Sequence, residues 1–278
     1  MFFRNFVVME TKGDELRKRV KALFFDIDGT LVSFQTHTVP ASTVEALTAA
    51  RQRGVGIYIA TGRPWQFINN LAPIAHLIDG YMTTNGAYCY AGDRTLCLKP
   101  IPHEAVLKMK KMADRKGFAC IFMSTKGVAI VNANEKMQRV MDGILGLTEI
   151  VTLTTFEEAV SHPVLEITPF ITPDEEASVL QQMPGCQVLR WHHDFADITL
   201  ATADKGKGLA EMAKAEGFEA EEAMAFGDGG NDVAILKAAG IGVAMGNAAD
   251  EVKAQADYVT DSVDDDGISH ALRHFGII

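Results

Sequence analysis

Short apolar runs alternate with amphipathic stretches near the start of the chain. The apolar runs at residues 20–25 and 55–60 predict buried strands. Between them, residues 40–43 (Pro-Ala-Ser-Thr) suit a first helical turn, and apolar side chains then keep one face until Gly54. A strand, a helix and a second strand within about 40 residues predict a parallel β-α-β unit.

The last third of the chain repeats this rhythm, whereas the middle differs from it. Near the end we expect helices at residues 206–217, 233–239 and 249–256 and strands at 223–227, 241–245 and 258–260. In the middle we expect strands near 88–90, 118–123, 128–131, 164–168 and 195–200, with helices at 104–116 and 173–183. Strands that follow one another without helices indicate a mixed or antiparallel sheet. The pattern therefore predicts an α/β protein: a discontinuous parallel-sheet core, residues 1–87 and 201–278, interrupted by an α+β domain, residues 88–200.

The charge balance argues against some classes of partner. The 278 residues include 26 Lys and Arg and 36 Asp and Glu, for a formal net charge of −10, and 47% of them are hydrophobic. A nucleic-acid binder needs a basic face, so we expect no nucleic-acid partner. No run of about 18 uninterrupted apolar residues is present, so we also expect no membrane span.

The cysteines and the first residues of the chain indicate the cellular compartment in which the protein works. Four cysteines are scattered without a C-x-x-C pair, which indicates reduced thiols packed in a cytoplasmic protein. The start of the chain lacks the features of a signal peptide, and residues 1–18 have no clear role. We expect a monomer or a weak homodimer.

Acidic side chains follow two of the expected strands. Asp26 and Asp28 come directly after the first buried strand, and Asp228 and Asp232 follow another. Ligand sites in open parallel sheets form at the carboxyl ends of strands, so these four acids are expected to converge. Carboxylates held close together repel each other unless a cation compensates, and oxygen ligands favour Mg²⁺.

Other motifs fail on spacing. The loop from Asp26 is not an EF-hand, because Gly29 stands at position 4 and His37 at position 12. The Gly206-Lys207 pair has no glycine five residues before it, which excludes a P-loop. His192 and His193 could bind a metal, but the sequence has no third ligand at the spacing of a known metal site. Packing or solvent exposure is therefore the better interpretation of this pair.

Together these residues resemble the haloacid dehalogenase (HAD) phosphotransferases. Order and spacing match four motifs and two segments of the Cof-type branch, with Gly230 as a departure where the branch often carries a polar residue. The motifs are Asp26-x-Asp28-Gly29-Thr30-Leu31, Thr61-Gly62-Arg63, Asp204-Lys205-Gly206 and Gly227-Asp228-x-x-Asn231-Asp232, and the segments are Asn85-Gly86-Ala87 and Met245-Gly246-Asn247-Ala248. The resemblance implies a Rossmann-like HAD core with an inserted cap.

The resemblance also implies roles at the metal and the reacting atoms. Asp26 would be the nucleophile that forms an aspartyl-phosphate, and Asp28 the general acid and then base. The family places Mg²⁺ between the Asp26 carboxylate, the Asp28 backbone carbonyl and Asp228. Asp232 and Asn231 would orient that shell.

A further set of residues would bind the phosphate. Lys205 supplies a fixed positive charge, and Thr61 can donate a hydroxyl. The alternatives are a helix cap for Thr61, a surface lysine for Lys205 and a turn residue for Asn85. The full set of candidates is Thr61, Gly62, Asn85, Gly86, Lys205 and Asn231.

The place of the insertion narrows the function. Only 30 residues separate Thr30 from Thr61, whereas 117 separate Ala87 from Lys205, as in the α/β caps of Cof-type sugar phosphatases and phosphomannomutases. We therefore expect a magnesium-dependent phosphomonoester hydrolase that acts on small phosphorylated metabolites, in particular sugar phosphates. A phosphomutase and a non-catalytic phosphosugar-binding regulator are the alternatives. Candidates for reading the substrate, with packing at the hinge as the alternative role, are Arg190, Trp191, His192 and His193.

Overall fold

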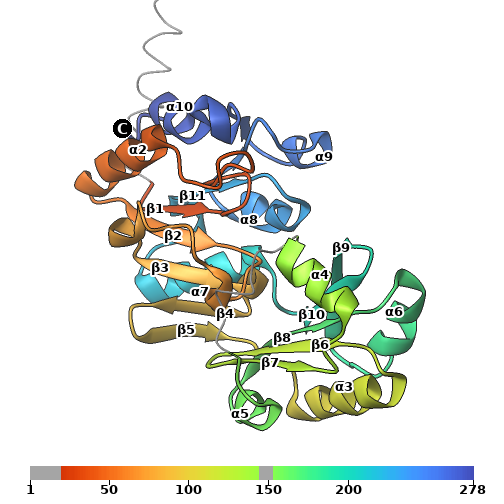
Figure 1. The fold of residues 1–278 in the computed structure, drawn as a ribbon. Helices are drawn as coiled ribbons and strands as arrows, with labels where there is room; N and C mark the ends of the chain where they lie inside the picture. Colours follow the sequence, from red (N-terminus) through yellow and green to blue (C-terminus); the bar gives the residue numbers. More distant parts are fainter. Residues whose placement is uncertain (1–19, 144–152) are drawn as a thin grey trace, which may run out of the picture. The chain divides into compact units, whose positions relative to one another are not determined.

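The computed structural model describes residues 20–143 and 153–278, and the chain divides into two compact units (Figure 1). The core unit holds the described residues up to Gly62 together with Asn70–Cys97 and Asp204–Ile278. The inserted unit holds Arg63–Asn69 and Leu98–Ala203. The segment 1–18, for which the sequence indicates no role, lies outside the described residues.

The core unit is built on an eight-stranded sheet in the order β13-β12-β11-β1-β2-β3-β4-β5. The pairs from β13 to β3 are parallel, and β3 pairs with β4 in the antiparallel direction. The strands are β1 (Ala22–Phe25), β2 (Gly56–Ala60), β3 (Gly80–Thr83), β4 (Tyr88–Ala91), β5 (Arg94–Leu98), β11 (Ala223–Gly227), β12 (Ile241–Ala244) and β13 (Tyr258–Val259). The helices are α2 (Ala41–Gln52), α7 (Lys205–Glu216), α8 (Val233–Ala238), α9 (Asp250–Lys253) and α10 (Gly267–His274).

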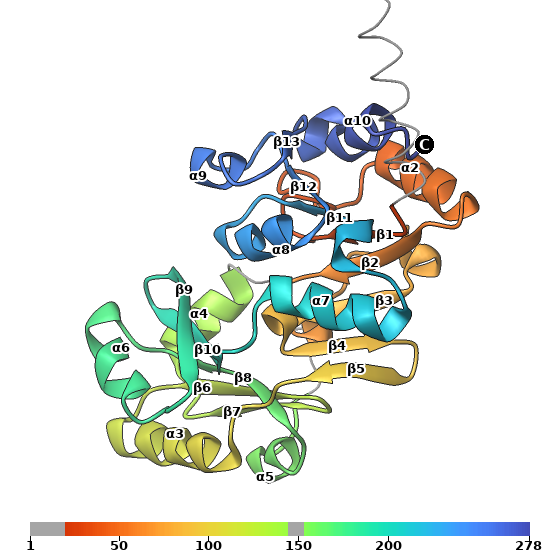
Figure 2. The same cartoon turned by 180° about the vertical axis from the view of Figure 1, so that it is seen from behind.

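Helices cover both faces of this sheet because alternate side chains of its buried strands point to opposite sides. Phe24 of β1 belongs to the cluster that includes Leu209 of α7 and Leu236 of α8. Figure 2 shows α7 and α8 in front of the sheet. The next residue of β1, Phe25, stacks on Phe226. Helix α2 packs against β2 and α10. This α/β architecture confirms the expected fold class.

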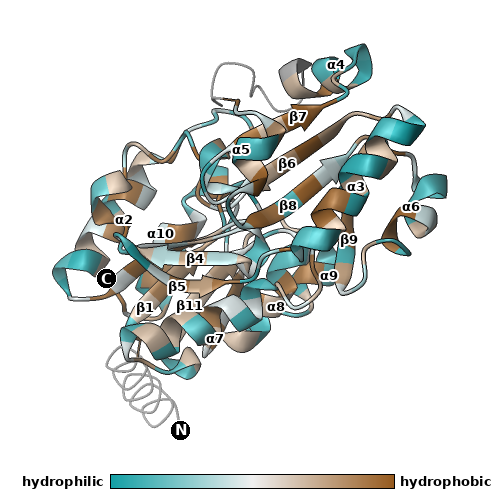
Figure 3. Cartoon of the chain, turned by 90° about the horizontal axis from the view of Figure 1, so that it is seen from below, coloured by the Kyte–Doolittle hydropathy of each residue, from teal (hydrophilic) through white to brown (hydrophobic). Residues whose placement is uncertain are grey.

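The inserted unit has its own five-stranded sheet, in the order β7-β6-β8-β10-β9, with antiparallel pairs throughout. The strands are β6 (Cys120–Ser124), β7 (Val128–Val131), β8 (Val164–Pro169), β9 (Cys186–His192) and β10 (Phe195–Leu200). The helices are α3 (His103–Lys116), α4 (Glu135–Gly143), α5 (Phe156–Val160) and α6 (Pro173–Leu180). In Figure 3, α3 carries hydrophobic and hydrophilic colours, as an amphipathic surface helix should.

The two faces of the inserted sheet differ in what covers them. On one face Phe122 packs with side chains of α3, α5 and α6. On the other face Ile121 and Met123 pack with side chains of α4 and with Phe67. Polar side chains of β8 share this second face, since Glu166 pairs in register with Met123, and Thr168 with Ile121.

The structure corrects some details of the sequence analysis. The strand expected at residues 88–90 is β4, which extends the core sheet through its pairing with β3, so the core unit continues to Cys97 instead of ending at 87. A hairpin can join a parallel sheet at its edge, which a local pattern does not reveal. The helix expected over 249–256 is limited to α9, and the sequence analysis gave no ranges for β3, β5, β9, α4, α5 and α10.

In the part of the chain that the structure describes, no helix combines the length and the apolar character needed to cross a membrane. The same part contains four free cysteines, as expected.

Candidate active site

Four adjacent strands of the core sheet end in the polar residues that the sequence singles out. In sheet order these strands are β11, β1, β2 and β3, and all four run in parallel. The residues that follow them are Asp228, Asp26, Thr61 and, one position further on, Asn85. Parallel strands bring their carboxyl ends to one edge, so these residues share an edge of the sheet.

Lys205 contacts two of the acids at this edge of the sheet. It is the first residue of α7, it is fully buried, and Asp204 caps the helix by accepting a hydrogen bond from the Lys207 backbone N–H at 2.8 Å. Its Nζ lies 2.6 Å from Asp26 Oδ1 and 2.5 Å from Asp232 Oδ1. A charged side chain is retained in such a place only when it is paired, so Lys205 is not the surface lysine that was the alternative.

Burial and charge shift the acid–base properties of these groups. Burial raises the pKa of Asp26 to about 8, with Asp232 adding to the rise and Lys205 opposing it. Burial also raises the pKa of Asp228 to about 6, although the hydrogen bond from Thr30 opposes this. Burial alone would lower the pKa of Lys205, but Asp232 and Asp26 hold it above its usual range. Lys205 therefore stays protonated, and its single positive charge does not fully balance the acids around it.

Asp232 has both of its carboxylate oxygens engaged by the protein. Oδ1 accepts from Lys205, and Oδ2 accepts from the backbone N–H groups of Asp228 at 3.0 Å and Gly229 at 2.9 Å. Asp232 thus closes the loop after β11 and holds Asp228 beside Asp26.

The donor set fits a hard divalent cation. Asp26, Asp228 and Asp232 each offer a carboxylate oxygen, and these oxygens all lie within 4.8 Å of one another. With all three carboxylates ionised, the single charge of Lys205 would leave two negative charges, which a divalent ion would balance. Oxygen-only ligands favour Mg²⁺. The Asp28 side chain does not belong to this group, within the residues that the structure describes.

The candidates for phosphate binding also come together. Asn231 Nδ2 donates to Asn85 Oδ1 at 3.0 Å, across 146 positions of sequence. A Cβ at Gly62 would lie 3.3 Å from the Asn85 amide and 3.4 Å from Asn231. Thr61 is buried, and its carbonyl accepts from the Asn85 backbone N–H at 3.0 Å.

The turn that carries Asn85 has an uncommon backbone. Thr84 and Asn85 both have φ 51°, and Gly86 has φ 86°. A left-handed conformation is rare for a β-branched residue such as threonine and is concentrated at functional sites. A Cβ at Gly86 would lie 2.6 Å from the Asp204 carbonyl oxygen, so only glycine allows this close approach. The turn is therefore fixed against the residue that caps α7.

Sequence reasoning missed two residues that contact Asp228. Thr30 Oγ1 donates to Asp228 Oδ1 at 2.9 Å, and Asn247 Nδ2 lies 3.3 Å from Asp228 Oδ2. Both stand inside segments that resemble the family, which was the only available signal. Their partner lies 198 and 19 positions away, respectively.

The inserted unit gives no support to Arg190 as a substrate-reading residue. Its guanidinium pairs with Glu176 and donates to four backbone carbonyls, those of Ile171, His192, His193 and Phe195. These bonds use the planar donor fork to hold the turn between β9 and β10 in place. Arg190 therefore has a structural role within the inserted unit, whereas the expected alternative was packing at the hinge.

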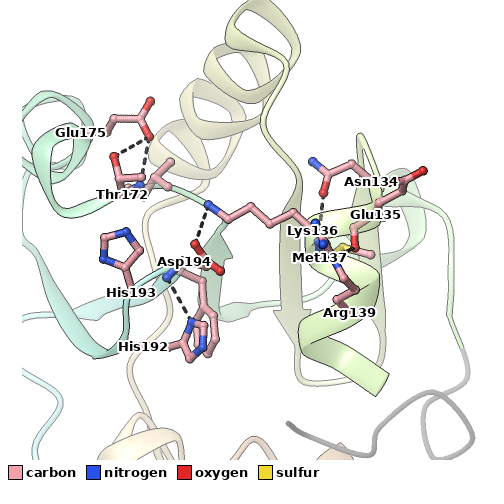
Figure 4. Close-up of polar contacts among 12 residues, drawn as sticks. Asn134, Glu135, Lys136, Met137, Arg139, Thr172, Glu175, His192, His193 and Asp194 are labelled. Atoms are coloured by element: carbon pink, nitrogen blue, oxygen red, sulfur yellow. Dashed lines mark hydrogen bonds and ion pairs between the residues drawn. The ribbon is translucent and has the colours of Figure 1, made fainter. Parts of the chain in front are cut away.

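The neighbouring histidines lie at the same turn (Figure 4). His192 Nδ1 accepts from the Asp194 backbone N–H at 3.1 Å, and its ring stacks on Phe195. Asp194 in turn pairs with Lys136 of α4 at 2.9 Å. The side chain of Trp191 lies outside the described part of the structure.

The fold is an α/β core whose sheet carries a cluster of acids at the carboxyl ends of its parallel strands, and comparisons with known proteins assign this class of protein to a family. The family model of haloacid dehalogenase-like hydrolases matches residues 23–272. The chain is 29% identical to the putative phosphatase YkrA of Bacillus subtilis, over 93% of this chain and 98% of that protein. It is 28% identical to the pyridoxal phosphate phosphatase YbhA of Escherichia coli, over 91% of this chain and 99% of that protein.

A solved structure supports the same assignment. The HAD subclass IIB sugar phosphatase BT4131 is 48% identical, with a TM-score of 0.82 over 93% of this chain and 100% of that chain. The chain belongs to the haloacid dehalogenase-like hydrolase family. It is a phosphatase of the Cof-type branch, which confirms the resemblance.

Proposed function

We propose that this phosphatase is a magnesium-dependent phosphomonoester hydrolase that acts on small phosphorylated metabolites, in particular sugar phosphates, through an aspartyl-phosphate at Asp26. The observation that carries the proposal is the buried Lys205, which joins Asp26 to Asp232 beside a third acid, Asp228. This arrangement supports a role for Asp26 as a nucleophile that lies between the charge of Lys205 and a bound divalent cation.

Asp26 and Asp28 have the two chemical roles. Asp26 forms a bond from a carboxylate oxygen to phosphorus while the bond from phosphorus to the alcohol oxygen breaks. Asp28, half-buried two positions further on, gives its proton to the departing alcohol and then takes one from the water that hydrolyses the acyl phosphate. The two steps return both carboxyl groups to their starting state and release inorganic phosphate.

The surrounding residues hold the phosphoryl group. Lys205 keeps Asp26 in place and neutralises charge that builds up on the phosphoryl oxygens. Thr61, Gly62, Asn85, Gly86 and Asn231 supply hydroxyl, amide and backbone donors at the same edge.

A magnesium ion would be held by Asp26, Asp228 and the Asp28 backbone carbonyl, and it would supply charge neutralisation for the phosphoryl transfer. Asp232 fits an orienting role better than that of a direct ligand, because Lys205 and two backbone N–H groups already engage its oxygens.

The proposed substrate class is supported by the names of similar proteins and by the presence of the inserted unit. BT4131 is named a sugar phosphatase and shares 48% of its sequence with this chain, whereas YbhA is named a pyridoxal phosphate phosphatase at 28%. We propose that the inserted unit is the cap that selects the substrate. The free cysteines support the proposal that the protein works in the reducing cytoplasm.

The test is hydrolysis of a panel of phosphomonoesters, sugar phosphates included, with and without Mg²⁺, by the wild type and by Asp26→Asn. We expect phosphate release only by the wild type with Mg²⁺, and highest kcat/KM for sugar phosphates. Asp250→Asn, an exposed acid on α9, is the matched control and should behave as wild type. Equal turnover by wild type and Asp26→Asn would remove Asp26 as the nucleophile.

A further inference from the structure

Asn247, in the loop after β12, joins two parts of the site that come from opposite ends of the chain. Its Nδ2 donates to the Gly29 carbonyl at 2.9 Å, across 218 positions, and to Asp228 Oδ2 at 3.3 Å. A carboxamide nitrogen carries two hydrogens, so one side chain can serve both acceptors at once. Asn247 therefore ties the loop after β1 to the acid after β11.

The Asp228 carboxylate is held from both sides. Thr30 Oγ1 donates to Oδ1 at 2.9 Å, and Asn247 donates to Oδ2. Gly29 allows the loop to come this close, because its φ is +78° and a Cβ there would lie 2.2 Å from Asp228 Oδ2. With a donor on each oxygen, the plane of the carboxylate is defined before any ligand arrives.

The orientation of the Asn247 amide is itself specified by the backbone. The Val263 N–H donates to Asn247 Oδ1 at 3.0 Å, which places the oxygen on that side and the nitrogen toward Asp228. Val263 is the first residue of a 3-10 turn (Val263–Asp265), and the segment around it is fixed by backbone bonds from Gly246 to Asp261 and from Gly267 to Ser262, both at 3.0 Å. The C-terminal segment thus determines which way the amide points.

We propose that Asn247 is a positioning residue that sets the affinity of the site for its divalent cation, with the Val263 N–H holding its amide in the effective orientation. The inference rests on the proposed cation site at Asp26 and Asp228. A carboxylate that is already aligned loses less freedom when it binds a cation, and partners of metal ligands commonly change metal affinity by roughly 10-fold to 100-fold. Asn247 touches neither phosphorus nor the nucleophile in this role.

The experiment measures cation binding directly on the full chain, without turnover. Binding of Mn²⁺ is followed by the loss of its free electron paramagnetic resonance signal, and binding of Mg²⁺ by titration calorimetry. The variants are Asn247→Ala, which removes both donors, and Val263→Pro, which removes the N–H that orients the amide and replaces the buried valine side chain by a proline ring. Proline suits the first position of a turn, and Ser262 before it already has extended backbone (φ −68°, ψ 166°). The matched control is Ser262→Ala, because the Ser262 hydroxyl donates instead to Asp265 at 2.6 Å.

The expected result is a Kd for Mn²⁺ about tenfold or more higher in Asn247→Ala. In Val263→Pro we expect a rise of about threefold, as for the loss of one hydrogen bond. Ser262→Ala should bind as the wild type does. A wild-type Kd in either folded variant, with folding checked by circular dichroism, overturns the inference. If the wild type itself binds neither ion, the proposed cation site fails instead, and the two failures are thereby distinguished.

Discussion

Lys205 Nζ lies 2.6 Å from Asp26 Oδ1, although the two residues are 179 positions apart. The pair brings together the two parts of the core unit that flank the insertion. Since Lys205 is fully buried, its charge has to be balanced inside the protein, and Asp26 and Asp232 do so.

Replacing Lys205 with methionine should damage both catalysis and stability. Loss of the fixed cation should lower kcat roughly 100-fold or more. The free energy of unfolding should fall by about 3–5 kcal/mol, because Asp26 and Asp232 would lose their buried partner. Phosphate release and urea unfolding measure the two effects. Lys207→Met is the control, since this lysine is 60% exposed and pairs with Asp204, and it should cost at most about 1 kcal/mol. Similar effects in both variants would contradict the assignment.

Gly86→Ala should disturb the start of α7 and thus the site. The new Cβ would meet the Asp204 carbonyl at 2.6 Å, and the φ of 86° is unfavourable for alanine. Gly92→Ala separates the two effects, because Gly92 has φ 56° and nothing within 4 Å of its Cβ position. The control should lose about 1–2 kcal/mol of unfolding free energy from the backbone alone. We expect a larger loss for Gly86→Ala, with reduced kcat. Equal losses and unchanged kcat would show that the contact with Asp204 is unimportant.

The stability of the inserted unit should depend on pH through Glu166. Burial, and then the charge of Asp197, raise the pKa of Glu166 well above its usual value in the folded state. The folded state therefore holds this proton more tightly than the unfolded chain does. The resulting stabilisation is complete below about pH 4.5, the usual pKa of glutamate, and is lost as the pH rises toward the folded-state pKa.

Glu166→Gln removes this titration, so the variant should gain stability relative to the wild type as the pH increases. Urea unfolding at pH 5 and pH 8 measures the difference, which should be larger at pH 8. Glu157→Gln, at an exposed acid on α5, should show no such trend. A constant difference at the two pH values would refute the assignment.

Arg190→Lys should destabilise the inserted unit although it keeps the charge. A lysine cannot reproduce the planar fork that reaches four backbone carbonyls. We expect a loss of about 2 kcal/mol or more in unfolding free energy, measured by urea denaturation. Arg139→Lys is the matched change at an exposed helical arginine that makes a single backbone bond, to Glu135 at 3.3 Å, and it should be nearly neutral. A neutral Arg190→Lys would return Arg190 to the candidates for ligand binding.

Much of the site was predictable because its chemistry is local in sequence. An apolar run that ends abruptly in Asp26 indicates both a buried strand and an acid at its carboxyl end. The same logic found Asp228 after β11 and Thr61 after β2. The structure brings these residues to one edge of the sheet, as the parallel β-α-β pattern predicts. The roles of the individual residues stay predictions until the variants are measured.

By itself, the sequence determined the α/β class, the family and the set of acids at the strand ends, because strand periodicity and short motifs are properties of neighbouring residues. Only the tertiary structure decided that β4 and β5 extend the core sheet, that Arg190 holds a turn, and that Thr30 and Asn247 hold Asp228. Those outcomes depend on which distant groups reach hydrogen-bonding distance, and that depends on how the elements pack, which a local pattern does not encode.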